Sequence, residues 1–363
     1  MKNTKYLFDN NKTPEGMVSV SQLQLFLSCR KKWEYGYIEN LTPRIDRAYL
    51  TIGKLCHVGM QTAMQYKWEH ERNGDYSCEE ALKTACLAIA DEHGKYMISN
   101  DFLPEEIPEV EDMLVDATNV FEQAFYEFDI DRFEVVTLQK NGEQIPALEL
   151  HFCVPCPPTK GLHGYIDAIL CEKETGFVWC TDYKFRKTLA PDEDEAFNIQ
   201  NAVYAYACNK MGIEITGTMT WQHLNTPAAE PQVLKNGSIS RAKIKTTWEK
   251  YAECCRDHGQ DPESYREEMQ EKLADIEWWR STLEYRNEPT IKRIWGECVV
   301  PVAKMVKAAR GVKAANFRSL YPWNCKTCQY QSICQAELRD HDAAYIRQNE
   351  YTTRTHVNQQ KTT

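Results

Sequence analysis

Apolar residues in the first third of the chain recur three or four positions apart, which is typical of amphipathic helices. The stretch SVSQLQLFLSCRKKWEYGYI predicts a first helix with Ser19 or Ser21 as its N-cap. Further helices are expected after Gly53 and over residues 77–97 and 109–129. The first part of the domain is therefore predicted to be mainly helical.

From about residue 131 the pattern changes to short apolar and alternating runs, which indicate strands. The expected strands cover residues 132–139, 146–154, 161–171, 176–186 and 215–224. The link EKETG contains Gly176 and joins two of these strands as a hairpin. A helix over residues 196–212 ends at Gly212. The alternation predicts an α/β fold with a mixed central sheet flanked by helices, an N-terminal helical region and a C-terminal cysteine cluster.

The expected organisation is a single domain, residues 19–340, between flexible tails at residues 1–18 and 341–363. Its expected parts are a helical part (19–130), a catalytic sheet core (131–225), a helical insertion (241–297) and a cluster-binding segment (321–338). Within the insertion, residues 243–286 are expected to be helical and polar, and a last helix is expected over residues 297–311.

Composition limits the class of protein. The 363 residues have a net charge of −10, contain no apolar run of membrane-span length and begin without an apolar signal segment. We therefore expect a cytoplasmic protein with no membrane association, and cysteines that are thiols or metal ligands instead of disulfides. The negative charge argues against a uniformly basic nucleic-acid binder.

One basic segment interrupts this acidic chain. No acid occurs between Glu297 and Glu337, and this segment contains several basic residues: Lys304, Lys307, Arg310, Lys313, Arg318 and Lys326. It is either a phosphate-binding surface or a solvated helix face.

The predicted hairpin brings acids together. An antiparallel register centred near Glu174 and Thr175 places Asp167 opposite Asp182, and Lys184 follows on the same face. Opposed carboxylates repel, and a divalent cation would remove this repulsion. The lysine could then act on a metal-bound water or stabilise developing phosphorane charge. The alternative is a set of unrelated surface charges.

The segments GYIDAIL and VWCTDYKFR resemble the D…D-x-K core of the PD-(D/E)XK nucleases, and this resemblance implies a restriction-endonuclease-like core. NIQNAVYAYA resembles the Q-x-x-x-Y motif of the RecB-like branch, through Gln200 and Tyr204, and TIGKLCHVGMQTA resembles its G-x-x-x-H segment, through His57. The resemblance implies Mg²⁺ or Mn²⁺ held by His57, Asp167, Asp182 and the backbone carbonyl of Tyr183. It also implies Gln200 and Tyr204 as supports for Lys184 and the DNA strand. Glu149 lies on the preceding strand, but no motif supports it and it is left out of the predicted site.

Four cysteines fit one metal site. CKTCQYQSIC supplies Cys325, Cys328 and Cys334, and a tetrahedral or cubane site needs a fourth ligand. Cys29 lies in LSCRKKWEYGYI, which resembles the opening of RecB-like nucleases that carry a [4Fe–4S] cluster. The resemblance favours that cluster, with Zn²⁺ as the alternative. Cys153, Cys156, Cys254 and Cys255 are expected to be structural.

The resemblance implies a deoxyribonuclease, with an exonuclease expected ahead of an endonuclease, of the kind found in phage recombination and CRISPR adaptation. Its partners would be DNA and a recombination or single-strand-annealing protein. The expected DNA contacts are Arg30, Lys31, Lys32 and the basic stretch from Lys304 to Arg318. The alternatives are a non-catalytic DNA-binding scaffold of the same fold and a zinc-stapled adaptor. Strand polarity and oligomeric state stay open.

Overall fold

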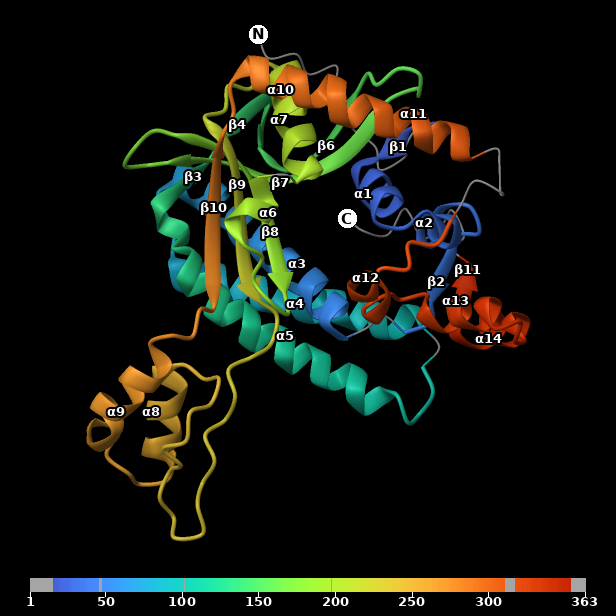
Figure 1. Ribbon diagram of the computed structural model, residues 1–363. Helices are drawn as coiled ribbons and strands as arrows, with labels where there is room; N and C mark the ends of the chain where they lie inside the picture. Colours follow the sequence, from blue (N-terminus) through green and yellow to red (C-terminus); the bar gives the residue numbers. More distant parts are fainter. Residues whose placement is uncertain (1–15, 46–47, 101, 197, 311–316, 354–363) are drawn as a thin grey trace.

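The computed structural model describes residues 16–45, 48–100, 102–196, 198–310 and 317–353. A mixed seven-stranded sheet forms the centre of this part of the chain (Figure 1). Its path runs β1-β7-β8-β9-β10, and β3 and β6 also pair with β7. The strands are β1 (Val18–Ser19), β3 (Phe133–Val135), β6 (Leu148–Val154), β7 (Leu162–Glu172), β8 (Val178–Arg186), β9 (Gly217–Leu224) and β10 (Trp279–Tyr285). The predicted α/β fold with a mixed sheet is confirmed.

Helices cover both faces of the sheet, and each face has its own hydrophobic core. One core packs α3 (Ala48–Asn73), α4 (Cys78–Ser99) and α5 (Ile107–Phe128) against the sheet. The other packs α1 (Val20–Ser28), α7 (Ile199–Met211) and α11 (Val300–Ala309). Gly59 allows α3 to approach α5 closely, because a Cβ at this position would lie 2.6 Å from the Phe121 ring. The candidate site lies between these layers, beside the inner strands β7 and β8.

The hairpin of β7 and β8 has the predicted register. Ala168 pairs with Thr181 and Cys171 pairs with Val178, around a turn in which Gly176 has a φ of 70°. The left-handed backbone at Gly176 costs little without a Cβ, so the turn fixes the register. Asp167 and Asp182 come directly after the last pair of this ladder.

The predicted helical insertion is wrong in two respects. Residues 279–285 form strand β10, which pairs antiparallel with β9, and the excursion from the sheet begins directly after β9 at residue 225. The protruding part contains α8 (Trp248–Asp257) and α9 (Glu263–Leu273), with a small core of its own around Tyr251 (Figure 1). The alternation in WWRSTLEY carries a strand signal that the polar residues around it obscured.

Two segments from the N-terminal and C-terminal parts of the described chain pair with each other. Strand β2 (Leu41–Pro43) pairs with β11 (Tyr351–Thr353), and Tyr330 Oη donates to the Leu41 carbonyl at 2.8 Å. Residues 343–353 are therefore ordered as α14 (Ala343–Glu350) and β11, so the predicted C-terminal tail begins too early. The N-terminal tail ends earlier than predicted, because Val18 is buried in β1.

The first predicted helix is two helices. Ser19 caps α1 by accepting from the Gln22 N–H, as predicted, but the extended backbone of Cys29 separates α1 from α2 (Arg30–Tyr37). The expected last helix starts earlier, because α10 (Glu288–Ile294) and a π-helical segment, η3 (Trp295–Val299), lead into α11. The other elements are η2 (Ile130–Arg132), β4 (Thr137–Lys140), β5 (Glu143–Pro146), α6 (Asp192–Ala196), α12 (Pro322–Lys326) and α13 (Gln331–Leu338). Within the described ranges, every helix is too short or too polar to cross a membrane.

Candidate active site

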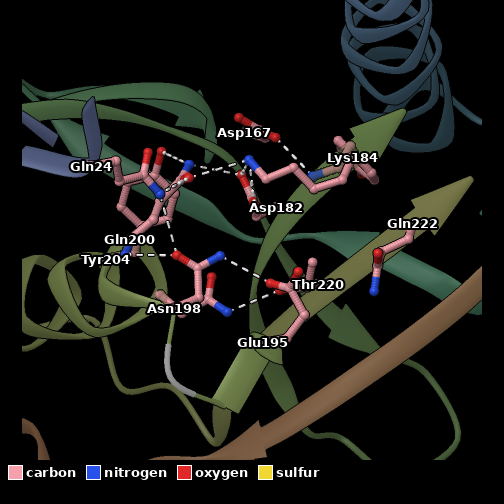
Figure 2. Close-up of polar contacts among 12 residues, drawn as sticks. Gln24, Asp167, Asp182, Lys184, Glu195, Asn198, Gln200, Tyr204, Thr220 and Gln222 are labelled. Carbon is pink, nitrogen blue, oxygen red and sulfur yellow. Dashed lines mark hydrogen bonds and ion pairs between the residues drawn. The ribbon is translucent and has the colours of Figure 1, made fainter. Parts of the chain in front are cut away.

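Strand β8 places an acid and a base side by side. Asp182 and Lys184 leave the same face of the strand, and Lys184 Nζ lies 2.8 Å from Asp182 Oδ1 and 2.7 Å from Oδ2 (Figure 2). Asp182 is only 1% exposed, whereas the Lys184 side chain is 23% exposed. The lysine thus neutralises a buried carboxylate and still reaches the cavity beside it.

Asp167 and His57 approach this pair from β7 and α3. Asp167 Oδ2 accepts a hydrogen bond from the Tyr183 backbone N–H at 2.8 Å, beyond the last pair of the β7–β8 ladder (Figure 2). His57 Nδ1 lies 3.5 Å from the same oxygen, and the His57 ring also hydrogen-bonds the Tyr183 backbone. The structure therefore brings the predicted His57, Asp167, Asp182 and Tyr183 backbone together.

Helix α7 supports the pair through its first turn. Gln200 Oε1 accepts from Lys184 Nζ at 3.2 Å, and Gln200 Nε2 donates to Asp182 Oδ1 at 3.0 Å and to Tyr204 Oη at 2.7 Å (Figure 2). Tyr204 is buried, with its ring edge against Phe152. The i, i+4 spacing in the sequence predicted this shared helical face.

The buried acids have raised pKa values. Burial, together with the charge of Asp167, raises the pKa of Asp182 to about 6, although Lys184 acts in the opposite direction. Burial raises the pKa of Asp167 as well. Burial and the nearby Lys184 lower the pKa of His57 to about 4, so its imidazole is neutral at physiological pH. The site thus carries buried carboxyl groups that are incompletely compensated beside a neutral imidazole.

Glu149 is a site residue that the sequence analysis left out. It lies on β6, between the residues that pair with Ala168 and Ile166 of β7, and it lines the same cavity as Asp167. Burial and the charges of Asp167 and Asp182 raise the pKa of Glu149 to about 8. Its φ of 42° is unusual for a side chain with a Cβ, and such backbone strain is common at functional sites. The β6–β7 register was the signal that could have identified it.

The donor set fits a divalent cation. Carboxylates, a neutral imidazole and a backbone carbonyl are ligands that Mg²⁺ or Mn²⁺ accepts. Asp182 Oδ2 is buried and accepts no hydrogen bond of good geometry, although Lys184 Nζ is near it. Within the described part of the chain, no three His, Cys, Asp or Glu side chains are placed closely enough to hold a metal ion together. The donor atoms therefore agree with a divalent cation in their chemical type, and the distances between these side chains do not by themselves form a metal site.

A recess lined by more basic than acidic side chains lies beside the site. A cavity of about 1030 Å³ is lined by His57, Asp167 and Lys184. Four further cationic side chains line the same cavity: Lys54, Lys140, Arg186 and Lys187. The ammonium of Lys187 lies 4.9 Å from the centre of the Tyr49 ring, which also lines the cavity. These cations were not predicted as DNA contacts, because they are scattered over the sequence and only the fold gathers them.

The basic residues that were predicted from sequence lie elsewhere, and most bind other parts of the protein. Lys31 pairs with Glu34 at 3.2 Å and with Glu337 at 3.5 Å, and Arg318 also pairs with Glu337. Several others make contacts within the chain: Arg310 with the Met17 carbonyl and Gln22, Lys307 with the Pro158 carbonyl, and Arg30 with the Phe26 and Phe317 rings.

The remaining residues of that set differ in position. Lys304 is exposed on α11, Lys32 lies near Cys328, and Lys313 lies outside the described residues. The cavity cations are therefore better placed to contact a substrate at Asp182 than the predicted basic stretch.

The four predicted cysteines occupy one region, near the pairing of β2 with β11. Ser319 contacts two of them, since its N–H points to Cys29 Sγ at 3.4 Å and its carbonyl accepts from Cys325 Sγ at 3.6 Å. Burial raises the pKa of Cys328, and the neighbouring Cys29 and Cys334 raise it further. Arg318 Nε donates to Cys334 Sγ at 3.3 Å. The structure thus places Cys29 in the same region as three cysteines about 300 positions further along the sequence, although no three of these thiols in the described structure are close enough to hold a metal ion together.

Comparison with known families agrees with this geometry. The family model of the PD-(D/E)XK nuclease superfamily matches residues 17–335.

The chain belongs to the PD-(D/E)XK nuclease superfamily.

The match spans β1 to α13, so it includes the hairpin acids, Lys184, α7 and all four cysteines of the terminal region. No curated protein matches the chain. Membership in the PD-(D/E)XK superfamily supports a metal-dependent nuclease.

Proposed function

We propose that the chain is a metal-dependent deoxyribonuclease of the RecB-like branch that degrades DNA as an exonuclease. The observation that carries the proposal is the contact of Lys184 with Asp182 and Gln200, beside a recess that Lys184, Asp167 and four further cationic side chains line. Buried like charges cost stability, and functional sites are where such costs are commonly retained.

The proposed roles follow from position. His57, Asp167, Asp182 and the Tyr183 carbonyl would hold Mg²⁺ or Mn²⁺, which when bound supplies Lewis-acid polarisation of a phosphate and of its attacking water. Lys184 orients the attacking water or stabilises charge on the phosphoryl oxygens. Gln200 holds Lys184 and Asp182 in place, and Tyr204 holds Gln200.

The recess supports action on DNA ends. Asp182 is almost fully buried and Asp167 lines a cavity, so a flexible strand end reaches this site more easily than the middle of a stiff duplex. Lys54, Lys140 and Lys187 would bind the phosphates of that strand. The resemblance to phage-recombination and CRISPR-adaptation nucleases favours a recombination or single-strand-annealing protein as the partner.

Linear and circular substrates test the exonuclease proposal. With Mn²⁺ or Mg²⁺, end-labelled linear DNA should be degraded to nucleotides or short fragments, while covalently closed single- and double-stranded circles should stay intact. Cutting of the circles at a comparable rate would make the protein an endonuclease with the same site. Binding of DNA without metal-dependent cutting would favour a non-catalytic scaffold.

We further propose that Cys29, Cys325, Cys328 and Cys334 hold a [4Fe–4S] cluster, with Zn²⁺ as the competing occupant. Support comes from the shared region of the four thiols and from their partly apolar surroundings, since Cys328 and Cys334 pack against a core that contains Tyr35 and Tyr330. Strands β2 and β11 already join the N-terminal and C-terminal parts of the domain, so the metal would reinforce this contact.

The colour of an anaerobic preparation tests the cysteine site. We expect brown protein with sulfur-to-iron charge-transfer absorption and about four irons per chain. Cys334→Ser should lose most of the iron, whereas Cys298→Ser, at an exposed cysteine of the π-helical segment, should keep it. Colourless wild-type protein that contains one zinc per chain would overturn the iron–sulfur proposal.

A further inference from the structure

Helix α1 contacts the candidate site through one side chain that no motif includes. Gln24 is partly buried on α1, and its Nε2 donates to Gln200 Oε1 at 3.2 Å and to Asn198 Oδ1 at 3.3 Å. Figure 2 shows Gln24 on the far side of Gln200 from Lys184. Gln24 is separated from both partners by more than 170 positions in the sequence, so only the fold brings them together.

We propose that Gln24 is a positioning residue for Lys184 and that it acts by fixing the orientation of the Gln200 amide. The inference rests on the proposed nuclease function. Gln24 contacts Gln200, and Gln200 in turn contacts Lys184, so Gln24 acts on the lysine indirectly.

A backbone donor fixes the direction of the whole chain of hydrogen bonds. The Gln200 N–H donates to Asn198 Oδ1 at 3.0 Å, as the N-cap contact of α7, so this oxygen is an acceptor. Asn198 Nδ2 correspondingly donates to Glu195 at 2.9 Å. Gln24 must therefore present its NH₂ group to Asn198 Oδ1.

The second hydrogen of the same Gln24 NH₂ group then points to Gln200 and selects one of its two amide orientations. In that orientation Gln200 Oε1 faces both Gln24 and the ammonium of Lys184, and Gln200 Nε2 faces Asp182 and Tyr204. The flipped amide would place an NH₂ group against the lysine ammonium and against Gln24, and an oxygen against the Asp182 carboxylate. Lys184 and Asp182 favour the same orientation of the Gln200 amide, and the contact from Gln24 adds a further matched donor that holds the amide in it.

Two substitutions of similar size separate this role from packing. Gln24→Met keeps the length of the side chain but removes the donor, and Gln24→Glu replaces the donor by an acceptor that faces two oxygens. We expect kcat for DNA cleavage to fall about tenfold in Gln24→Met and further in Gln24→Glu. KM for DNA should change less than twofold in both, and Gln65→Met, on the outer face of α3, should behave as the wild type.

The Gln200 background tests the route of the effect. If Gln24 acts through Gln200, adding Gln24→Met to Gln200→Met should cost less than a further twofold in kcat. Full additivity of the two losses, or wild-type kcat in both Gln24 variants, would overturn the inference. A fall in the melting temperature of Gln24→Met large enough to account for its loss of activity would also overturn the inference, because that pattern indicates a packing role.

A second readout needs no catalysis. The side-chain ¹⁵N–¹H₂ resonances of Gln200, assigned by comparison with Gln200→Glu, should shift or broaden in Gln24→Met and stay unchanged in Gln65→Met. Unchanged Gln200 resonances in Gln24→Met would overturn the inference even if the protein proved not to be a nuclease. Absence of cutting by the wild type would contradict the proposed function alone.

Discussion

Replacing Lys184 by methionine should lower the rate of DNA cleavage by about a thousandfold while the fold is retained, because preorganised charge at a reacting phosphate contributes effects of this size. Methionine keeps much of the length of the side chain but cannot donate to Asp182 or Gln200 or carry charge to the cavity. The loss should occur in kcat, with little change in KM, since four other cationic side chains line the recess.

The same substitution should destabilise the metal-free protein. Lys184 Nζ lies within hydrogen-bond distance of both oxygens of Asp182, which is 1% exposed, so its removal leaves a buried carboxylate without a counter-ion. Breaking a buried pair in this way costs about 3–5 kcal/mol of the free energy of unfolding. The cost should be smaller at pH 5 than at pH 8, because Asp182 can take up a proton at the lower pH.

A double variant separates the two effects. Lys184→Met combined with Asp182→Asn has no uncompensated charge at this position, so most of the lost stability should return in urea denaturation. Cleavage should stay lost. Recovery of cleavage together with stability would mean that Lys184 serves only to balance Asp182, and it would contradict the catalytic role.

Glu149→Gln should stabilise the protein at pH 8 when metal is removed with a chelator. Burial, Asp167 and Asp182 raise the pKa of Glu149 to about 8, well above the usual value of about 4.5. Between these two pH values the folded state keeps a proton that the unfolded state releases, so stability decreases as the pH rises through this window. One such proton changes the free energy of unfolding by at most about 1.4 kcal/mol per pH unit.

The pH profile identifies the residue. Asp182, with a pKa raised to about 6, and Asp167 contribute a decrease of the same sign, so the difference between the wild type and Glu149→Gln isolates the part that belongs to Glu149. In urea denaturation at pH 6, 7 and 8 with EDTA, the wild type should lose more stability over this range than Glu149→Gln. Added Mn²⁺ should stabilise the wild type at pH 8, since a cation offsets the carboxylate repulsion.

Glu172 provides a control of opposite sign. Its hydrogen bond from Thr175 and its pairing with Arg132 lower its pKa, so its contribution to stability is present above pH 4.5 and is lost only as the pH falls. Glu172→Gln should therefore destabilise the protein at pH 6, 7 and 8 alike. If Glu149→Gln also destabilised the metal-free protein at pH 8, the carboxylate of Glu149 would have to be compensated in the fold.

The sequence predicts the parts of the site that depend on local geometry. The turn at Gly176 sets the register that brings Asp167 next to Asp182, and the strand period places Lys184 beside Asp182. Helical spacing places Gln200 and Tyr204 on one face of α7. These relations need only a few neighbouring residues and the known repeats of strand and helix.

Features that depend on contacts between distant parts of the chain could not be predicted in full from the sequence. The β6–β7 register places Glu149 opposite Asp167, but no residue type at position 149 indicates the left-handed backbone that the structure has there. Gln24 reaches Gln200 only because α1 packs beside α7 against the sheet. Strand β10 was predicted as helix because of the polar residues around it. In the structure its pairing with β9 outweighs the propensity of those residues.

The most direct test of the account is cleavage by metal-stripped protein that is then given Mn²⁺. Labelled linear DNA is mixed with the wild type and with Asp182→Asn, a variant that removes one proposed ligand and keeps its shape. Cleavage by the wild type should appear only after Mn²⁺ is added and should be absent from folded Asp182→Asn at every Mn²⁺ concentration. Cleavage by Asp182→Asn at the wild-type rate, or by the wild type in excess EDTA, would contradict a metal-dependent nuclease site built on this hairpin.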